Sequence, residues 1–267
     1  MGPAAPKTAG YARTMELRAE TDHLGQHVGE PVEPASAHLP DPTRSLDGRY
    51  CRLEPLDAER HGEQLWAAFT EDAAGSTWTY LGVGPFPDEP AFAAWLRGLQ
   101  GAEDPFFYAI LDAVSGQAIG VASFLRIDPG ARSIEVGWIT YSPRLRRSRV
   151  ATDAMHCMMR EAFALGYRRY EWKCNALNLP SIEAAHRLGF TFEGLFRQAL
   201  VVKGRNRDTA WFAVIDRDWP RLDQAFQRWL HPDNFDADGR QRERLSDLTA
   251  PVVAARWPRL EVSVREH

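Results

Sequence analysis

Residues 142–154 read Ser142-Pro143-Arg144-Leu145-Arg146-Arg147-Ser148-Arg149-Val150-Ala151-Thr152-Asp153-Ala154, and they are the most informative segment of the chain. The apolar run before it predicts the end of a strand, the arginines predict a turn, and the residues after it have helical spacing. The N-terminus of a helix offers unpaired backbone N–H groups and the positive end of the helix dipole. Such a turn can bind a pyrophosphate, with the arginines adding charge-assisted contacts. A solvated basic turn is the alternative interpretation.

The segments on either side of this turn alternate between strand and helix patterns. The expected strands cover residues 49–55, 106–114, 118–127, 134–141, 170–174, 192–203 and 208–216. The expected helices cover residues 57–69, a segment around 92–99, and residues 152–165, 181–188 and 219–230. The order indicates an antiparallel meander, a β-α-β crossover and a closing hairpin. It predicts an α/β (α+β) protein with a mixed, mostly antiparallel sheet flanked by helices.

The composition divides the chain into three parts. Residues 1–45 are polar and rich in Pro, Ala, Gly and Glu, which indicates an extended N-terminal arm. Residues 46–230 carry the periodic segments and are expected to form one domain. Residues 231–267 are expected to form a charged C-terminal tail with one apolar stretch, Pro251–Trp257.

The bulk properties narrow the class of protein. The 267 residues are 44% hydrophobic and 25% charged, which is typical of globular proteins. A net charge of −4 argues against nucleic-acid binding, which needs a basic face. Three cysteines without a C-x-x-C pair indicate neither a disulfide framework nor a metal site. The first fifteen residues lack the apolar core of a secretion signal, and no run approaches the ~18 apolar residues of a membrane span. We therefore expect a cytoplasmic protein that binds no membrane.

Several motifs together resemble one family. Residues 146–151 resemble the pyrophosphate motif Q/R-x-x-G-x-G/A of the GNAT superfamily of N-acetyltransferases, with Arg149 in place of the middle glycine. Three further stretches, over residues 175–181, 187–194 and 208–211, resemble the N-x-x-N-x-x-S, LGF…EG and final-strand Asp motifs of its ribosomal-protein and antibiotic-resistance branch. The resemblance covers about residues 48–220. It implies the GNAT fold, with a twisted sheet of about seven strands, and acetyl-CoA as the co-substrate.

The resemblance also implies where acetyl-CoA binds. The expected contacts are main-chain pairing and hydrogen bonds from the strand end, the turn and a later loop: Ile139, Thr140, Tyr141, Arg146, Arg147, Ser148, Arg149, Val150, Ala151, Asn175 and Asn178. Arg146 is the first choice among the arginines for the phosphates. Glycine is used where the backbone approaches closely or takes a positive φ. Arg149 therefore implies an ordinary φ, or a side chain that points outward or reaches a phosphate.

The family's reaction is direct attack of a neutral amine on the thioester, helped by a base, an oxyanion-binding N–H group and an acid. Ser181 matches the position of the acid, with a helix N-cap as its structural alternative. Glu135 is the candidate base, because a desolvated carboxylate accepts a proton more readily; a salt bridge is the alternative. The carboxylate of the ribosomal branch is replaced by Leu200. Fallback candidates are Glu193, His186 and Asp208.

The acceptor is expected to bind between the early helices and the last hairpin. Residues 77–82 resemble the substrate-side loop of the family, and the hairpin tip 203–208 is basic. That tip either steers an anionic acceptor or is a solvated turn. The predicted function is acetyl transfer to a primary amine of a small molecule or of a peptide or protein N-terminus. The alternatives are a catalytically weak or inactive acyl-CoA-binding module and a protein that binds another phosphate. A homodimer is plausible for the family, but no sequence feature indicates one.

Overall fold

The computed structural model describes residues 17–258, 260 and 262. Its main sheet has eight strands in the order β3-β4-β5-β6-β7-β8-β10-β9 within this described part. The strands are β3 (Leu46–Asp47), β4 (Cys51–Pro55), β5 (Phe106–Asp112), β6 (Ala118–Asp128), β7 (Ser133–Tyr141), β8 (Arg169–Asn175), β9 (Thr191–Val202) and β10 (Arg205–Ile215). Neighbours run antiparallel except β7 and β8, which pair in parallel. The predicted fold class is confirmed, and the short β3 adds the eighth strand.

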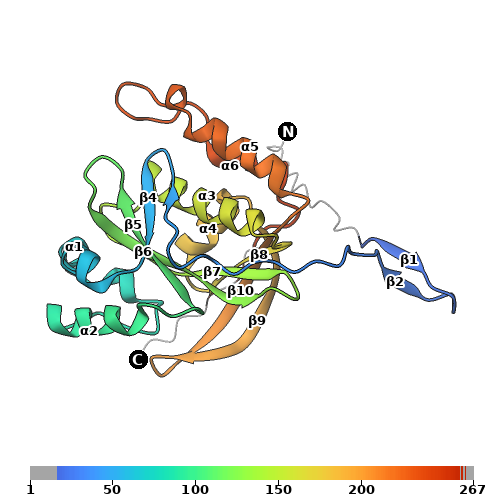
Figure 1. Cartoon of the computed structure of the whole chain (residues 1–267), viewed down its shortest axis with the longest axis horizontal. Helices are drawn as coiled ribbons and strands as arrows, with labels where there is room; N and C mark the ends of the chain where they lie inside the picture. The colour runs from blue at the N-terminus through green and yellow to red at the C-terminus, as the bar shows by residue number, and fades with distance from the viewer. Residues whose placement is uncertain (1–16, 259, 261, 263–267) are drawn as a thin grey trace, which may run out of the picture.

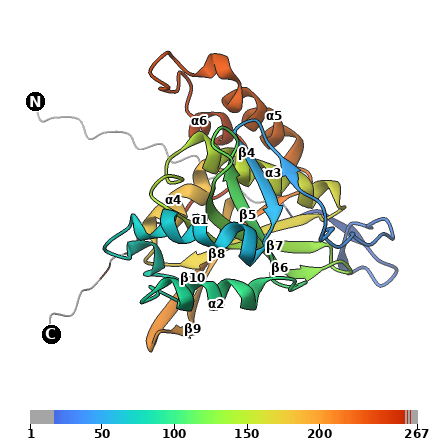
Figure 2. The same ribbon diagram turned by 60° about the vertical axis from the view of Figure 1, so that its left-hand side comes forward.

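Helices cover both faces of this sheet (Figures 1 and 2). One face is covered by α1 (Ala58–Thr70) and α2 (Glu89–Leu99), joined by a loop that contains the 3-10 turn η1 (Ser76–Trp78). The other face is covered by α3 (Arg149–Ala164) and α4 (Leu179–Arg187). Outside that layer lie α5 (Trp219–Leu230), η2 (Pro232–Asn234) and α6 (Leu245–Thr249), which pack on α3 and α4. The two helical layers bury an apolar core on each face of the sheet.

The apolar faces of the helices explain both cores. Met155, Met158 and Met159 recur at helical spacing on α3 and are buried against the sheet. On the opposite face, Phe92 of α2 packs against Trp78 and other aromatic rings of the α1–α2 layer. Most of the aromatic residues in this region therefore serve packing.

Two helices begin earlier than their periodicity predicts, because polar side chains before them act as caps. Ser148 Oγ accepts a hydrogen bond from the N–H group of Ala151 at 3.0 Å, so α3 begins at Arg149 rather than near Thr152. Asn178 Oδ1 accepts a hydrogen bond from the N–H group of Ser181 at 3.3 Å, so α4 begins at Leu179. The expected N-cap role of Ser181 is therefore wrong, and Ser181 lies within the first turn of the helix.

The segments at both ends of the chain contact the domain. A small exposed hairpin of β1 (Ala19–Thr21) and β2 (His27–Gly29) stands away from the main sheet in Figure 1. The chain then returns, and the N–H group of Ala37 donates to the Pro129 carbonyl at 3.1 Å. At the other end, Leu245 and Val252 join the core beside α3 and α4. Residues 231–257 thus form an integral layer of the described structure.

Of the helices that the structure describes, none combines the length and the apolar character that crossing a membrane requires.

Candidate active site

A cleft opens where the two parallel strands of the sheet separate. β7 and β8 pair only from Ser133 opposite Arg169 to Val136 opposite Trp172. Beyond that point Trp138 has a φ of 49°, and the register between β6 and β7 shifts, which bends β7 away from β8. The resulting cleft has a volume of about 1930 Å³ and is lined from both strands, the turn before α3 and the β9–β10 hairpin.

The turn before α3 forms one end of the cleft. The first N–H groups of a helix have no intrahelical partners, and Ser148 satisfies only that of Ala151. Positive φ occurs at Arg147 (56°), two residues before the position where the family has glycine. Arg149 therefore has an ordinary φ, which is one of the interpretations that the sequence offered for this position. The free N–H groups at the start of α3 leave this end of the cleft suited to an anion.

The side chain of Arg149 is held by two aromatic rings. Its guanidinium carbon lies 4.9 Å from the centre of the Tyr50 ring and 4.7 Å from that of Phe235. These are cation–π contacts, and Phe235 follows η2 in the C-terminal segment. The motif position that lacks glycine thus links the turn before α3 to the C-terminal segment, parts of which also line the cleft.

Arg146 is engaged by another loop. Its Nη2 atom lies 3.0 Å from Asp72 Oδ2 and also donates to the Thr77 hydroxyl, and its Nε atom donates to the Tyr141 carbonyl at 3.3 Å. Burial opposes ionisation of Asp72, but hydrogen bonds from Thr77, Ser76 and Arg146 outweigh it and hold the pKa of Asp72 well below its usual range. Arg146 therefore joins the turn to the loop after α1. These contacts compete with the direct role in phosphate binding that is expected of Arg146.

Arg187, at the end of α4, brings a positive charge that sequence reasoning did not select. Its Nη2 atom donates to Thr152 Oγ1 at 3.1 Å beside the start of α3, and the residue lines the cleft. Burial lowers the pKa of Arg187, and no carboxylate pairs with it among the described residues. Its position directly before the Leu188-Gly189-Phe190 motif gave no signal, because only the tertiary fold brings it to α3.

Ser181 lies in the cleft between two groups of β8. Its Oγ atom accepts a hydrogen bond from the indole N–H group of Trp172 at 3.1 Å, and the Cys174 side chain lies on the same strand as that indole. Because the indole can only donate, the hydroxyl keeps its own proton for donation. Burial raises the pKa of Cys174 to about 11, although Ser181 and Arg207 oppose the shift. The thiol is therefore protonated near neutral pH.

The two asparagines stabilise the loop between β8 and α4. Asn175 Oδ1 accepts a hydrogen bond from the N–H group of Leu177 at 2.9 Å, and Asn178 caps α4. Tyr80 crosses from the opposite loop and donates to the Leu177 carbonyl at 3.0 Å. Both asparagines line the cleft. Their hydrogen bonds are those expected of residues that hold this loop in place.

Glu135 lines the cleft within a buried network of ions. Its Oε2 atom lies 2.5 Å from Arg126 Nη1 and 2.9 Å from Lys173 Nζ, and Lys173 Nζ also lies 2.6 Å from Glu171 Oε2. Glu135 is only 3% exposed. The salt bridge that was the alternative interpretation of Glu135 is present, and its role as the base stays a prediction. The Oε1 atom lies beside Gly137 of the cleft, 3.5 Å from where a Cβ would stand.

The β9–β10 hairpin closes the side opposite the α1–α2 loop. Phe196 and Leu200 line the cleft and are 51% and 45% exposed. Lys203, at the hairpin tip, donates to the carbonyls of Trp78 and Gly84 at 2.8 and 2.6 Å. The loop between the early helices therefore meets the last hairpin at this half of the cleft, and acceptor binding there stays a prediction.

Several sequence-predicted residues lie elsewhere. Thr140 and Val150 do not line the cleft. Glu193 is paired with Arg169, Asp208 accepts hydrogen bonds from Gln198 and Asn206, and His186 Nε2 accepts the N–H group of Trp257 at 2.8 Å. Burial lowers the pKa of His186. The three fallback candidates for the base therefore serve structural contacts outside the cleft.

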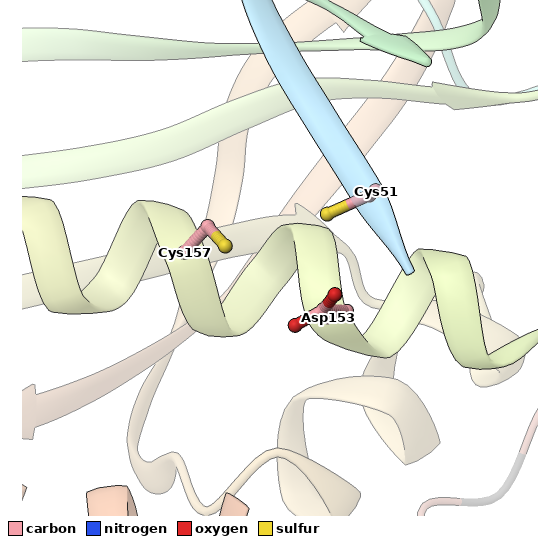
Figure 3. Close-up of side chains that lie close together, drawn as sticks. All are labelled: Cys51, Asp153 and Cys157. Atoms are coloured by element: carbon pink, nitrogen blue, oxygen red, sulfur yellow. The ribbon is translucent and has the colours of Figure 1, made fainter. Parts of the chain in front are cut away.

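A separate cluster of Cys51, Asp153 and Cys157 joins β4 to α3 (Figure 3). The three side chains are buried, with possible ligand atoms within 4.8 Å of one another. Asp153 Oδ2 already accepts the N–H group of Tyr50 at 2.6 Å. The hydrogen bond to Cys157, together with burial, raises the pKa of Cys51 far above its ordinary value. This cluster holds two elements of the fold together beside the cleft.

The family model for the acetyltransferase (GNAT) domain matches residues 51–191. The chain therefore belongs to the GNAT acetyltransferase family, whose members use acetyl-CoA, and it is an enzyme of the acyltransferase class.

Particular relatives support this assignment. A crystal structure of a GCN5-related N-acetyltransferase from Brucella melitensis is 44% identical, covering 82% of this chain and 99% of that one, with a TM-score of 0.79. A GNAT-family structure from Chromobacterium violaceum ATCC 12472 is 40% identical over 72% of this chain and 100% of that one, with a TM-score of 0.65. A Bacillus subtilis (strain 168) protein described as a "Putative ribosomal N-acetyltransferase YdaF" is 27% identical over 62% of this chain and 90% of its own length.

Proposed function

We propose that this enzyme transfers the acetyl group of acetyl-CoA to a primary amine by direct attack. The observation that carries the proposal is the cleft between β7 and β8, which connects the free N–H groups of α3 with the hydroxyl of Ser181. The pyrophosphate would bind at the start of α3, near the positive charge of Arg187. The unpaired edge of β7 from Trp138 to Tyr141 would pair with the pantetheine arm. These placements bring the thioester to the point where the strands separate.

Ser181 is our proposed acid for the departing thiolate. The indole of Trp172 fixes its oxygen as an acceptor and leaves its proton to donate. Transfer of that proton to the CoA sulfur removes charge as the carbon–sulfur bond breaks. Because the hydroxyl contacts no phosphate-binding group, its loss should affect turnover more than affinity.

Calorimetry with acetyl-CoA, followed by a free-thiol assay with a panel of amines, tests this proposal. The unmodified enzyme should bind acetyl-CoA and release CoA only when an amine is present. Ser181→Ala should bind acetyl-CoA equally well and lose roughly 10²-fold or more in kcat. Ser115→Ala, on the exposed β5–β6 turn, is the matched control and should behave as the unmodified enzyme.

Each other outcome points to one of the alternatives. Binding without turnover for every amine would identify a non-catalytic acyl-CoA-binding module. No binding at high micromolar acetyl-CoA would contradict the acetyltransferase proposal and favour a site for another phosphate.

We propose that Glu135 receives the amine proton at Oε1, directly or through water. Glu135→Gln should lower kcat and leave acetyl-CoA affinity unchanged, because Glu135 pairs with Arg126 and Lys173 and not with groups at the start of α3. Glu171→Gln is the control, since Glu171 shares Lys173 with Glu135 but does not line the cleft. Equal losses in both variants would show that Glu135 acts only by positioning Lys173, and the base would then be sought elsewhere.

A further inference from the structure

Arg207 of β10 reaches the acceptor half of the cleft without a carboxylate partner among the described residues. Its Nε atom is buried and has no hydrogen-bond partner there. Thr209, two residues further along the strand, also lines the cleft; it is 4% exposed, and its Oγ1 atom has no partner either. Because buried polar atoms are normally paired, two neighbouring unpaired groups mark a place where a ligand's polar atoms fit.

The charges around Arg207 do not balance. Arg126 and Lys173 are cations, but the carboxylates of Glu135 and Glu171 pair with them. Lys173 also lies 3.6 Å from the centre of the Trp211 ring, which covers it. Arg207 is the third cation of this group, and it leaves one positive charge in excess. Burial lowers the pKa of Arg207, although Cys174 and Glu135 oppose the shift, so an incoming anion would restore the balance.

The surroundings of Arg207 are otherwise apolar. Phe196 and Leu200 line the cleft and are about half exposed, and Trp138 of β7 also lines it. Leu200 pairs with Arg207 in the β9–β10 ladder, so the apolar wall and the cation are adjacent. A ligand that fills this half of the cleft therefore combines an apolar body with one anionic group.

We propose that Arg207 and Thr209 bind a carboxylate of the acceptor, so that the acceptor is an amine with an apolar body and a carboxylate. This inference rests on the proposed function, because it names the acceptor class of that site. A guanidinium binds a carboxylate through two parallel N–H donors, and a hydroxyl adds a third. The carboxylate can be that of a free amino acid or that of an acidic residue next to a peptide N-terminus.

Binding of acetylated products tests this inference without requiring turnover. N-acetylleucine and N-acetylleucinamide, titrated into the CoA-loaded enzyme, differ only in the carboxylate. N-acetyl-Leu-Asp-amide and N-acetyl-Leu-Asn-amide are the corresponding peptide pair. We expect the acid to bind on the order of 10- to 100-fold more tightly than the amide in one of the two pairs, the one that identifies the source of the carboxylate.

Two variants assign that preference to Arg207. Arg207→Met should abolish the preference, and Arg205→Met, an exposed arginine on the same strand that does not line the cleft, should retain it. Equal binding of acid and amide in both pairs, or no binding of any probe, would overturn the inference even if Arg207→Met failed to fold. Turnover with amines that lack a carboxylate would leave the acetyltransferase proposal intact, so the two failures are distinguishable.

Discussion

In the family motif a single glycine stands where this chain has Arg149, but here the positive φ occurs at Arg147. Arg147 takes the left-handed backbone conformation, and Arg149 begins α3 with its side chain between the rings of Tyr50 and Phe235. A left-handed φ costs an L-residue about 1–2 kcal/mol, so Arg147 is the strained position of the turn. Arg149 is stabilised by its two ring contacts.

This difference between the two positions predicts a larger loss of stability for one of two glycine substitutions than for the other. Arg149→Gly should lower the free energy of unfolding by about 1–3 kcal/mol, because it removes two cation–π contacts and places glycine in a helix. Arg147→Gly removes the same charge but relieves the positive φ, so stability should change by less than about 1 kcal/mol. Urea unfolding of both variants measures the difference. Equal losses would show that the charge, and not the ring contacts, stabilises the turn.

The sequence predicts site residues best where the neighbouring residues show which strand ends and which helix begins. Ser181, Asn175 and Asn178 follow a strand and open a helix, and all three line the cleft. Arg187 was missed as a site residue, because nothing near it in sequence shows that α4 turns it toward the cleft. Arg207 was noted only as part of the basic hairpin tip 203–208, because the sequence does not show that β10 turns it into the cleft. The hydrogen bond from Arg146 to Asp72 could not be predicted either, because 74 positions separate the two residues in the sequence.

At the scale of elements, the C-terminal segment behaves as part of the domain. Val252 and Val253 are 5% and 6% exposed, and the N–H group of Phe192 on β9 donates to the Ala255 carbonyl at 3.0 Å. The charged composition of residues 231–267 predicts a tail, but its one apolar stretch, Pro251–Trp257, contains the buried anchors Val252 and Val253. Short stretches of this kind have no periodicity from which burial can be predicted.

Removing those anchors should therefore destabilise the protein. The double variant Val252→Ala and Val253→Ala should lower the free energy of unfolding by about 2–4 kcal/mol, since it deletes buried methyl groups and leaves cavities. Val114→Ala is the control, because Val114 is 95% exposed and its replacement should matter by less than about 0.5 kcal/mol. A double variant as stable as the control would mean that the segment contributes little to folding.

The cluster that joins β4 to α3 leads to a prediction about metals. Cys51, Asp153 and Cys157 supply three ligands, one fewer than a structural zinc site needs, and Asp153 already accepts a backbone hydrogen bond. Zinc also requires thiolates, whereas the pKa of Cys51 is strongly raised. Elemental analysis should find no stoichiometric metal, and a chelator should leave the thermal midpoint unchanged. A midpoint that falls with chelator and returns with zinc would contradict this prediction.

For the whole molecule, the sequence predicted the order and type of the main elements well. Long periodic segments such as α3 and α5 and the alternating strands determined the topology, because one buried face imposes a clear period. The separation of β7 and β8 could not be predicted, since it depends on the bulge at Trp138 and on how the sheet packs. The boundaries moved where single capping residues, Ser148 and Asn178, extended a helix.

Three buried histidines make the stability of the whole molecule depend on pH. Burial lowers the pKa of His61, His156 and His186, although carboxylates beside the first two oppose the shift. The unfolded chain therefore binds more protons below the ordinary histidine value of about 6.5. The stabilisation is complete above that pH and is lost as the pH falls through the lower native values.

Urea midpoints at pH 7.5, 6.5 and 5.5 should therefore decrease in that order. Replacing His186 with Asn should remove part of the decrease, because that site would no longer titrate. Midpoints that stay constant or rise toward pH 5.5 would contradict the prediction.

Lys203 links two segments that flank the acceptor half of the cleft. Its two hydrogen bonds to the carbonyls of Trp78 and Gly84 join the hairpin tip to the loop after α1, and other residues of both segments line the cleft. At about 0.5–1.5 kcal/mol for each bond, the state with both bonds broken is populated in on the order of one molecule in ten to one in a hundred. An acceptor that can enter only when these two segments separate would therefore associate more slowly by that fraction.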